Sequence, residues 1–459
     1  MIADLKPYPE YKESDLPWLQ RYPAHWVIKR GKAYLFCVDE RSKNGKEELL
    51  TVSSARGVIP RRSAKVTMFK AESYAGHKLC WPGDLVINSL WAWGGGLGVS
   101  QHHGIISTAY SVYRSRPSAK INPRYLHELV RSSAFHWELQ VRSKGVWISR
   151  LQLTDTSFLD APIPLPPPAE QAAIVRFLDH WNGRLEKAIR SKRRVIALLQ
   201  EQKQAIIHRA VTRGLDPNVK LKDSGIPWLG EIPEHWEVRR NMALFSLRVE
   251  SGVEGLPVLQ VSLRSGITME ELDQFGRPKK LIADATKYKR VHQGDMAYNT
   301  MRMWQGAVGV SPCDGLVSPA YVVIAPRGGT VPEFYDYVFH TDLYKQQVNR
   351  QSTGIVSDRN RLYWDSFKQM PNLVLPETEQ RDIISFILKE TGGIDLVITR
   401  YEREITLLRE YRTRLTADVV TGKLDVRAAA AQLPEEAEEE PLPESEIPEE
   451  ETEGEEVEG

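Results

Sequence analysis

The hydrophobic pattern divides the chain into mixed and helical segments. Two mixed segments, 14–165 and 224–375, carry short β-branched or aromatic runs that are interrupted by Gly, Pro and Asn. Such runs predict strands, here at 85–87, 110–113, 296–298 and 321–324. Proline is tolerated in the first helical turn, so Asn122-Pro123 predicts a helix to about Leu139, with a counterpart at Pro332. Each mixed segment is therefore expected to be a globular α/β domain.

A helical pattern follows each mixed segment. The proline-rich residues 164–168 end the first domain, and Glu170-Gln171 begins a helix. Glu379-Gln380 repeats this start after Pro376. A break in each helix is expected at the glycines Gly183 and Gly392-Gly393, because glycine disfavours helix interiors.

Beyond these breaks, apolar residues recur at alternating steps of four and three, which is the spacing of a coiled-coil seam. Lys203 and Arg412 place a basic residue at the same seam position of each helix, as a register marker would. Two such helices should pack as an antiparallel pair. Each runs roughly 27 residues past its break, or about 40 Å, and one turn of DNA is about 34–36 Å.

The two halves of the chain repeat one another. The motif Pro17-Trp18-Leu19 with Pro23, His25 and Trp26 returns as Pro227-Trp228-Leu229 with Pro233, His235 and Trp236, at an offset of 210. Gly83-Asp84 returns as Gly294-Asp295 at an offset of 211, and residues 212–216 return as 421–425 at an offset of 209. The offset between matching residues changes by only one or two positions over the whole repeat, which indicates two tandem copies.

Charge separates the body of the chain from its end. The formal net charge is +1, but residues 434–459 hold 14 Glu and no Lys or Arg. Without them, 61 basic residues face 46 acidic ones, so the body carries about +15. A basic body suits a polyanionic partner. The tail is expected to be disordered and to serve solubility, with competition against DNA as the other hypothesis.

The remaining composition excludes other classes. No apolar run approaches the roughly 18 residues of a membrane span, and residues 1–6 do not resemble a signal peptide. The cysteines Cys37, Cys80 and Cys313 are scattered, which argues against a zinc site or disulfide framework. A cytoplasmic protein is expected.

Three candidate chemistries fail when the two copies are compared. Residues 122–125 resemble the Asn/Asp-Pro-Pro-Tyr motif of amino-methyltransferases, but the second copy keeps only the proline, as a helix start would. The glycines at 94–96 lack the Lys-Ser/Thr and spacing of nucleotide loops. His102-His103 corresponds to Cys313-Asp314, which indicates a polar loop instead of a metal site. No catalytic, cofactor-binding or metal-binding residue is therefore assigned.

Basic and aromatic residues give the DNA-binding prediction. Lys and Arg contact phosphates, and Arg can also read guanine. The candidate DNA-binding residues are Arg56, Arg61, Arg62, Lys65, Lys78, Trp91, Trp93, Arg142, Lys144, Arg150, Arg264, Lys279, Lys280, Lys289, Arg290, Arg302, Trp304, Arg350, Arg359 and Arg361. Residues shared by both copies are expected to be scaffold, whereas unmatched ones, such as Trp91 opposite Arg302, are expected to set specificity.

In its order of duplicated motifs, the chain resembles the specificity (S) subunits of type I restriction-modification systems, over nearly its whole length except the tail. The resemblance implies two target-recognition domains that each read half of a split double-stranded DNA site. It also implies helices that act as a spacer and dock two methyltransferase (M) subunits, which restriction/translocase (R) subunits join. S-adenosylmethionine, ATP and Mg²⁺ would belong to those partners, so no cofactor is expected in this chain.

The expected fold is a mixed α+β and α/β architecture with an internal pseudo-two-fold repeat. Its parts are a first target-recognition domain (1–165), a first helical spacer (166–216), a second target-recognition domain (217–375), a second helical spacer (376–428) and an acidic tail (429–459). Two alternatives remain: a stand-alone DNA methyltransferase, and a helical interaction scaffold with no role on DNA.

Overall fold

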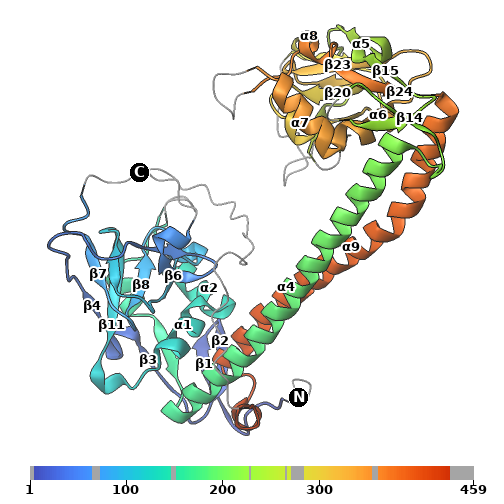
Figure 1. The fold of residues 1–459 in the computed structure, drawn as a ribbon. Helices are drawn as coiled ribbons and strands as arrows, with labels where there is room; N and C mark the ends of the chain where they lie inside the picture. The colour runs from blue at the N-terminus through green and yellow to red at the C-terminus, as the bar shows by residue number, and fades with distance from the viewer. Residues whose placement is uncertain are drawn as a thin grey trace. The chain divides into compact units, whose positions relative to one another are not determined.

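The computed structural model describes residues 5–64, 73–145, 151–226, 229–263, 266–269, 284–353 and 360–434. The chain forms two compact units, the first containing residues 1–191 and 403–459 and the second containing residues 192–402. Each unit holds one mixed domain and part of each of two long helices, α4 (Pro168–Arg213) and α9 (Glu377–Val420) (Figure 1).

The mixed domain of the first unit consists of short strands and three helices. The strands are β1 (Tyr11–Leu16), β2 (Leu19–Pro23), β3 (Val27–Arg30), β4 (Leu35–Val38), β5 (Leu50–Ser53), β6 (Gly57–Pro60), β7 (Lys78–Cys80), β8 (Leu85–Asn88), β9 (Leu97–Val99), β10 (Gly104–Ile106), β11 (Tyr110–Ser115) and β12 (Pro162–Leu165). The helices are α1 (Pro123–Arg131), α2 (Ser133–Arg142) and α3 (Asp155–Leu159). A short helix, α10 (Arg427–Ala431), follows α9 in this unit.

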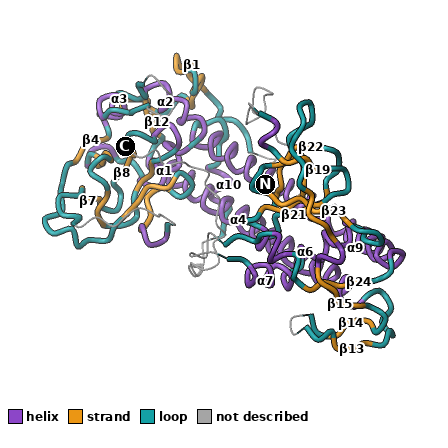
Figure 2. Tube along the Cα trace, turned by 90° about the horizontal axis from the view of Figure 1, so that it is seen from above, coloured by secondary structure: helices purple, strands orange, loops and turns teal. Residues whose placement is uncertain are grey.

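The mixed domain of the second unit repeats this order. Its strands are β13 (Leu221–Asp223), β14 (Glu231–Pro233), β15 (Glu237–Arg240), β16 (Phe245–Arg248), β17 (Leu259–Ser262), β18 (Gly266–Met269), β19 (Lys289–Val291), β20 (Met296–Asn299), β21 (Val308–Val310), β22 (Gly315–Val317), β23 (Tyr321–Pro326) and β24 (Pro371–Val374). Its helices are α5 (Asn241–Leu244), α6 (Pro332–His340), α7 (Asp342–Gln351) and α8 (Trp364–Phe367). Figure 2 shows how much loop joins these short elements.

Each domain is centred on a four-stranded sheet of matching topology. The order is β4-β11-β8-β9 in the first unit and β16-β23-β20-β21 in the second. All pairs among the named strands are antiparallel. Parallel pairs would need long crossovers between strands, so the α+β class describes these sheets and the α/β class does not.

The sheet of each domain is buried on both faces, which explains its uninterrupted apolar runs. In β8, Leu85 and Ile87 join one core cluster and Val86 joins another. In β20, Met296 and Tyr298 face one cluster while Ala297 faces the other. Successive side chains of a strand point to opposite faces, so a central strand between two cores must be apolar throughout.

Two expectations about helices were wrong. The helix expected from Asn122 to about Leu139 is two helices, because the Ser132 side chain accepts a hydrogen bond from the Phe135 N–H and begins α2. The breaks expected at glycine are also missing: α4 is continuous through Gly183, and α9 is continuous through Gly392-Gly393. A helical glycine costs only about 1 kcal/mol, which the contacts of a long paired helix can offset.

Ion pairs connect the long helices within each unit. In the first unit Arg412 Nη1 lies 3.0 Å from Glu186 Oε2. In the second, Lys203 Nζ lies 2.6 Å from Asp395 Oδ1. In the second unit Lys192 Nζ also lies 4.7 Å from the centroid of the Tyr401 ring. Within this unit, the later residue of α4 therefore contacts the earlier residue of α9, which is an antiparallel order.

A carboxylate at the start of each long helix fixes that helix to its domain. Glu170 is buried, and its oxygens accept from the Tyr8 hydroxyl at 2.5 Å and the Trp26 indole at 2.8 Å. His25 Nε2 lies 2.7 Å from the same carboxylate. Burial, and then the hydrogen bond to Glu170, raises the pKa of Tyr8, which keeps its hydroxyl a donor.

The second unit uses the same device with fewer donors. Glu379 accepts from the Trp236 indole at 3.0 Å and lies 2.9 Å from His235 Nε2. The repeated His-Trp pair is thus a scaffold motif, as expected for residues that both copies share.

Each long helix ends against the repeated motif of the unit in which it ends. Gly214, just after α4, has φ +71°, and an added Cβ would lie 3.4 Å from the Trp236 ring. Gly422, just after α9, has φ +75°, and an added Cβ would lie 2.4 Å from Pro23 Cδ. Glycine is needed at both helix ends because the backbone there adopts the left-handed conformation. In each unit the repeated motif therefore contacts the beginning of one long helix and the end of the other.

None of the helices in the described part of the chain has the length and hydropathy needed to cross a membrane.

Replacing Glu170 with Ala should destabilise the first unit by about 3 kcal/mol, because it leaves buried donors without an acceptor. Glu379→Ala is the matched control and should cost about 1 kcal/mol, since the Glu379 side chain is 25% exposed against 4% for Glu170. Urea unfolding followed by hydrogen exchange, which separates the units, measures both. Equal losses of unfolding free energy in the two variants would contradict the anchoring role assigned to Glu170.

His127 should make the first unit sensitive to acid. Burial, and then the nearby Arg131 and Arg124, lowers the pKa of His127 to about 4, and its Nδ1 accepts from the Val99 N–H at 3.2 Å. Stability should be complete above pH ~6.5 and fall by about 3 kcal/mol as pH drops to ~4, because only the unfolded state binds the proton readily.

The variant His127→Gln keeps an acceptor but does not titrate. Urea unfolding at pH 7 and pH 4.5 should therefore show a smaller acid loss for this variant than for the parent chain. The same loss in both chains would rule out His127 as the source.

Candidate nucleic-acid interface

Three segments that carry predicted DNA-binding residues lie together in the first unit. They are the β5–β6 hairpin with the turn after it, the loop between β8 and β9, and a third segment of which residues 142–145 and 151–153 are described. The Leu153 N–H donates to Ser89 O at 2.9 Å, which joins the third segment to the second. His136 of α2 also hydrogen-bonds the Trp93 carbonyl, so the helix before the third segment supports the loop.

Arg131 holds the hairpin and the loop side by side. Its guanidinium donates to Ser54 O at 2.7 Å and Ala55 O at 2.8 Å in the hairpin, and to Leu97 O at 2.7 Å beside the loop. Burial lowers the pKa of Arg131. Sequence reasoning missed this residue because nothing in its spacing distinguishes it from a surface arginine.

In the second unit the bond between the third segment and the loop recurs, whereas the bridge made by Arg131 is replaced. The Leu362 N–H donates to Thr300 O at 2.9 Å. Residue His340 ends α6 as Arg131 ends α1, but it hydrogen-bonds the Asp336 carbonyl within its own helix. A hollow of about 400 Å³ lies between the β17–β18 hairpin and the β20–β21 loop, lined by Gln260, Val261, Ser262, Leu263, Asn299, Arg302, Ala307 and Tyr321.

The two loops have the same internal framework. Asn88 Oδ1 accepts from the Leu90 N–H at 3.2 Å, and Asn299 Oδ1 accepts from the Met301 N–H at 3.0 Å. The Trp93 indole donates to Leu90 O at 3.1 Å, as the Trp304 indole does to Met301 O at 3.0 Å. Trp93 and Trp304 therefore stabilise the conformations of their loops.

Most described candidates fall on these segments. In the first unit they are Arg56, Arg61, Arg62, Trp91, Trp93, Arg142 and Lys144, and in the second they are Arg302, Trp304, Arg350 and Arg361. Six candidates lie outside the described residues: Lys65, Arg150, Arg264, Lys279, Lys280 and Arg359. Nothing tests contact with DNA at any of these positions, so the whole set stays a prediction.

Several candidates have partners within the protein. Lys78 Nζ donates to Tyr110 O at 2.7 Å, and Lys289 Nζ donates to Tyr321 O at 2.5 Å. These matched lysines have a shared structural role. Ion pairs also bind Arg62 to Glu48, Arg142 to Glu138 and Arg290 to Asp314.

The repeated Gly-Asp motif forms a turn beside the central sheet. Gly83 has φ +94° and Gly294 has φ +82°, conformations that favour glycine. Asp84 Oδ2 accepts from the Trp81 N–H at 3.0 Å, and Asp295 Oδ2 accepts from the His292 N–H at 2.9 Å. The motif is therefore scaffold in both copies.

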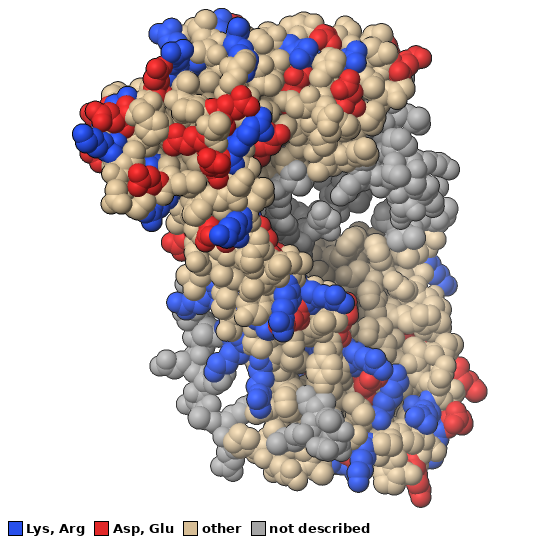
Figure 3. Space-filling model, turned by 90° about the vertical axis from the view of Figure 1, so that its right-hand side faces the viewer, with Lys and Arg blue, Asp and Glu red and all other residues tan. Residues whose placement is uncertain are grey.

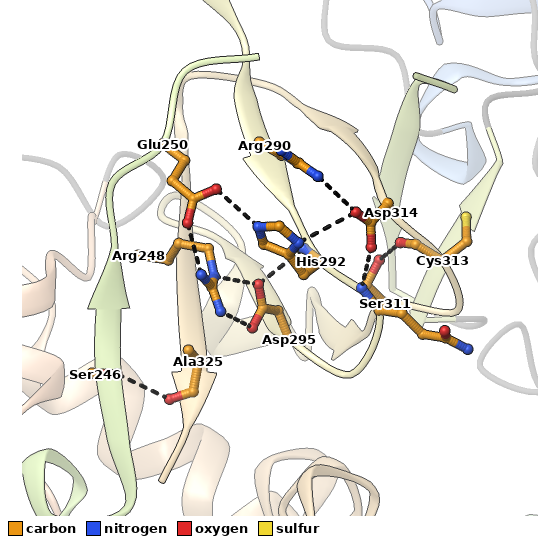
Figure 4. A network of polar contacts seen from close by, with 11 residues as sticks. Ser246, Arg248, Glu250, Arg290, His292, Asp295, Ser311, Cys313, Asp314 and Ala325 are labelled. Carbon is orange, nitrogen blue, oxygen red and sulfur yellow. Dashed lines mark hydrogen bonds and ion pairs between the residues drawn. The ribbon is translucent and has the colours of Figure 1, made fainter. Parts of the chain in front are cut away.

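In the second unit this turn is part of a polar network (Figure 4). Arg248 lies between Asp295, at 2.6 Å, and Glu250, at 2.7 Å. His292 joins Glu250 at 2.8 Å to Asp314 at 3.2 Å. Hydrogen bonds from His292 and then Arg248 lower the pKa of Glu250, so the carboxylate is ionised and its charge is used within the network.

The methyltransferase-like motif is a helix cap, as expected. Asn122 Oδ1 accepts from the Arg124 N–H at 2.8 Å at the start of α1. Tyr125 is buried, and its hydroxyl donates to Pro164 O at 3.0 Å. Across the described ranges, no group of three or more His, Cys, Asp or Glu is arranged to hold a metal ion.

Basic side chains are unevenly distributed over the surface. On the face in Figure 3, Lys and Arg gather in the lower half with few acidic residues between them, whereas both signs mix in the upper half. Exposed basic residues also follow α4 at Arg184, Lys187 and Arg194, which sequence reasoning did not include among the candidates.

Comparison with known proteins supports the resemblance drawn from the motifs. A protein of Methanocaldococcus jannaschii assigned as the MjaX specificity subunit of a type I restriction enzyme is 23% identical over 321 residues, which cover 67% of this chain and 69% of that protein. No family model matches the chain. The expected similarity to type I specificity subunits is confirmed at this level.

One solved structure from a type I R-M system has a similar fold. A chain from a study of complex assembly and conformational transition of the type I R-M system has a TM-score of 0.58 at 15% identity, covering 88% of this chain and 99% of that one. The HsdS subunit from Thermoanaerobacter tengcongensis has a TM-score of 0.44 at 16% identity, and the match covers 90% of this chain and 100% of that one. Only the first of these likenesses is close enough to indicate a common fold.

If the candidate residues contact phosphates, affinity for duplex DNA should fall steeply with salt. Each neutralised phosphate contributes roughly −0.9 to the slope of log affinity against log salt. Fluorescence anisotropy with a labelled duplex measures this slope for the full chain. Arg350→Ala should make it shallower by about 1, and a flat response in the parent chain would contradict the assignment of the basic surface.

Proposed function

We propose that this chain is the sequence-specific DNA-recognition subunit of a type I restriction-modification enzyme. Each mixed domain reads one half of a bipartite target on double-stranded DNA. The observation that carries the proposal is the duplication: two domains share one scaffold, yet the residues on equivalent loops differ. A protein that reads two different half-sites needs this combination of a constant framework and variable contacts.

The chain itself performs no catalysis under this proposal. Its one methyltransferase-like motif is used as a helix cap, which removes the main sequence argument for a stand-alone methyltransferase. S-adenosylmethionine, ATP and Mg²⁺ are held by partner subunits. The cysteines Cys37, Cys80 and Cys313 are free, which fits the cytoplasmic location expected from the sequence.

The long helices serve as spacer and docking surface, pairing as an antiparallel coiled coil. Exposed apolar side chains on α9 support docking, among them Leu388 at 59% exposure and Leu396 at 75%. Such residues on a helix that is already paired favour burial by another protein. The occupants are methyltransferase subunits, two in the expected assembly, which restriction/translocase subunits join. The basic loops distinguish the proposal from a helical interaction scaffold with no role on DNA, because such a scaffold would have no use for them.

The helices should set the distance between the half-sites. Seven residues inserted after Arg194 in α4 and seven after Glu404 in α9 lie between the two ion pairs in both helices, so Glu186–Arg412 and Lys203–Asp395 are kept. A seven-residue insertion preserves the seam and adds about 10 Å, or about three base pairs. Sequencing of methylated sites, in a host that also expresses the methyltransferase subunit, should show a longer spacer and unchanged bases.

An insertion of seven residues in α4 alone is the control, because it misaligns the helices and should abolish methylation. Altered bases with the double insertion would contradict the spacer role.

Exchange of residues 37–160 for the same region of a relative should change the bases read in one half-site only. A change in both half-sites would contradict the assignment of one domain to each half-site.

A further inference from the structure

At one of the positions where the β8–β9 and β20–β21 loops carry different residues, the backbone angles are closely similar. Trp91 has φ −126° and ψ 16°, and Arg302 has φ −126° and ψ 8°. The Trp91 N–H donates to Asn88 O at 3.0 Å, and the Arg302 N–H donates to Asn299 O at 3.1 Å. The two loops thus present different side chains from the same backbone position.

In the first unit the loop is built around the indole of Trp91. A Cβ added to Gly94 would lie 2.6 Å from Trp91 Cε2, and one added to Gly96 would lie 3.0 Å from Trp91 Cδ1. The ring also lies 4.7 Å from the ring of Trp93, centroid to centroid. Trp91 is therefore packed onto its own loop, and the glycines are what allow it to lie there.

In the second unit the same position is open. Arg302 is exposed and lines the hollow between hairpin and loop. Gln305 and Ala307 stand where the first unit has Gly94 and Gly96. Among the described residues, the Arg302 guanidinium has no hydrogen-bond or ion-pair partner, unlike Arg62, Arg142 and Arg290. As far as the described part of the chain is concerned, its donors are available to bind another molecule.

We propose that Arg302 reads a guanine in the half-site recognised by the second domain, and that Trp91 deprives the first domain of that contact. The inference rests on the proposed function. A guanidinium offers two parallel N–H donors, which match the O6 and N7 acceptors of guanine in the major groove. An indole offers no such pair, so guanine selection at this loop belongs to the second domain alone.

Methylated-site sequencing tests the proposal in a host that expresses the full chain with its methyltransferase subunit. The parent chain should give a bipartite motif with a guanine in the half that changes when residues 247–370 are exchanged. Arg302→Ala removes the paired donors, so discrimination for that guanine should fall roughly 5- to 150-fold. Every other base of both halves should stay the same. Arg302→Gln should admit adenine at that position, since Gln pairs with adenine N6 and N7.

Arg239→Ala is the matched control, because Arg239 is an exposed arginine on β15 of the same domain and is not a candidate DNA-binding residue. It should leave the motif unchanged, which separates base selection from a general effect of arginine loss. A guanine preference that survives Arg302→Ala, or a second half-site without guanine, would overturn the inference and leave the proposed function intact. A parent chain that directs methylation to no bipartite motif would overturn both.

Discussion

The structure depends on the carboxylate at the start of each long helix. Glu170 is almost completely buried and satisfied by Tyr8, His25 and Trp26. A buried carboxylate is costly without such donors, so the helix cannot tilt away from its domain without exposing unpaired groups. The same motif receives the end of the other helix at Gly422. One polar cluster therefore fixes both long helices to the first unit, and Glu379 has this role in the second.

A rigid framework of this kind leaves the loops free to differ. The asparagine and tryptophan bonds that shape the β8–β9 loop recur in the β20–β21 loop. Yet Arg131 connects hairpin and loop in the first unit, whereas His340 binds within its own helix in the second. Loop residues carry recognition on many scaffolds. The two copies thus combine constant support with different surfaces, as two half-sites would require.

Much of this architecture could be predicted from the sequence because it is periodic or repeated. The strands at 85–87 and 296–298, the paired scaffold motifs and the cap at Asn122 follow from local pattern and from comparing the copies. The continuity of α4 through Gly183 could not be predicted in this way. The free-energy cost of a glycine is a local property, whereas the stabilisation from helix pairing comes from residues far away in the sequence. Arg131 and the hollow beside Arg302 also escaped prediction, since both depend on segments far apart in the chain. Contact of the basic residues with DNA is still a prediction from charge and position.

The most direct test of one domain per half-site is a hydroxyl-radical footprint of the chain, with its methyltransferase subunits, on a duplex that carries the methylated motif. The account predicts two protected stretches with cleavable DNA between them. Changing the bases of one half should remove protection from that half first. A single continuous footprint that depends equally on both halves would contradict the account.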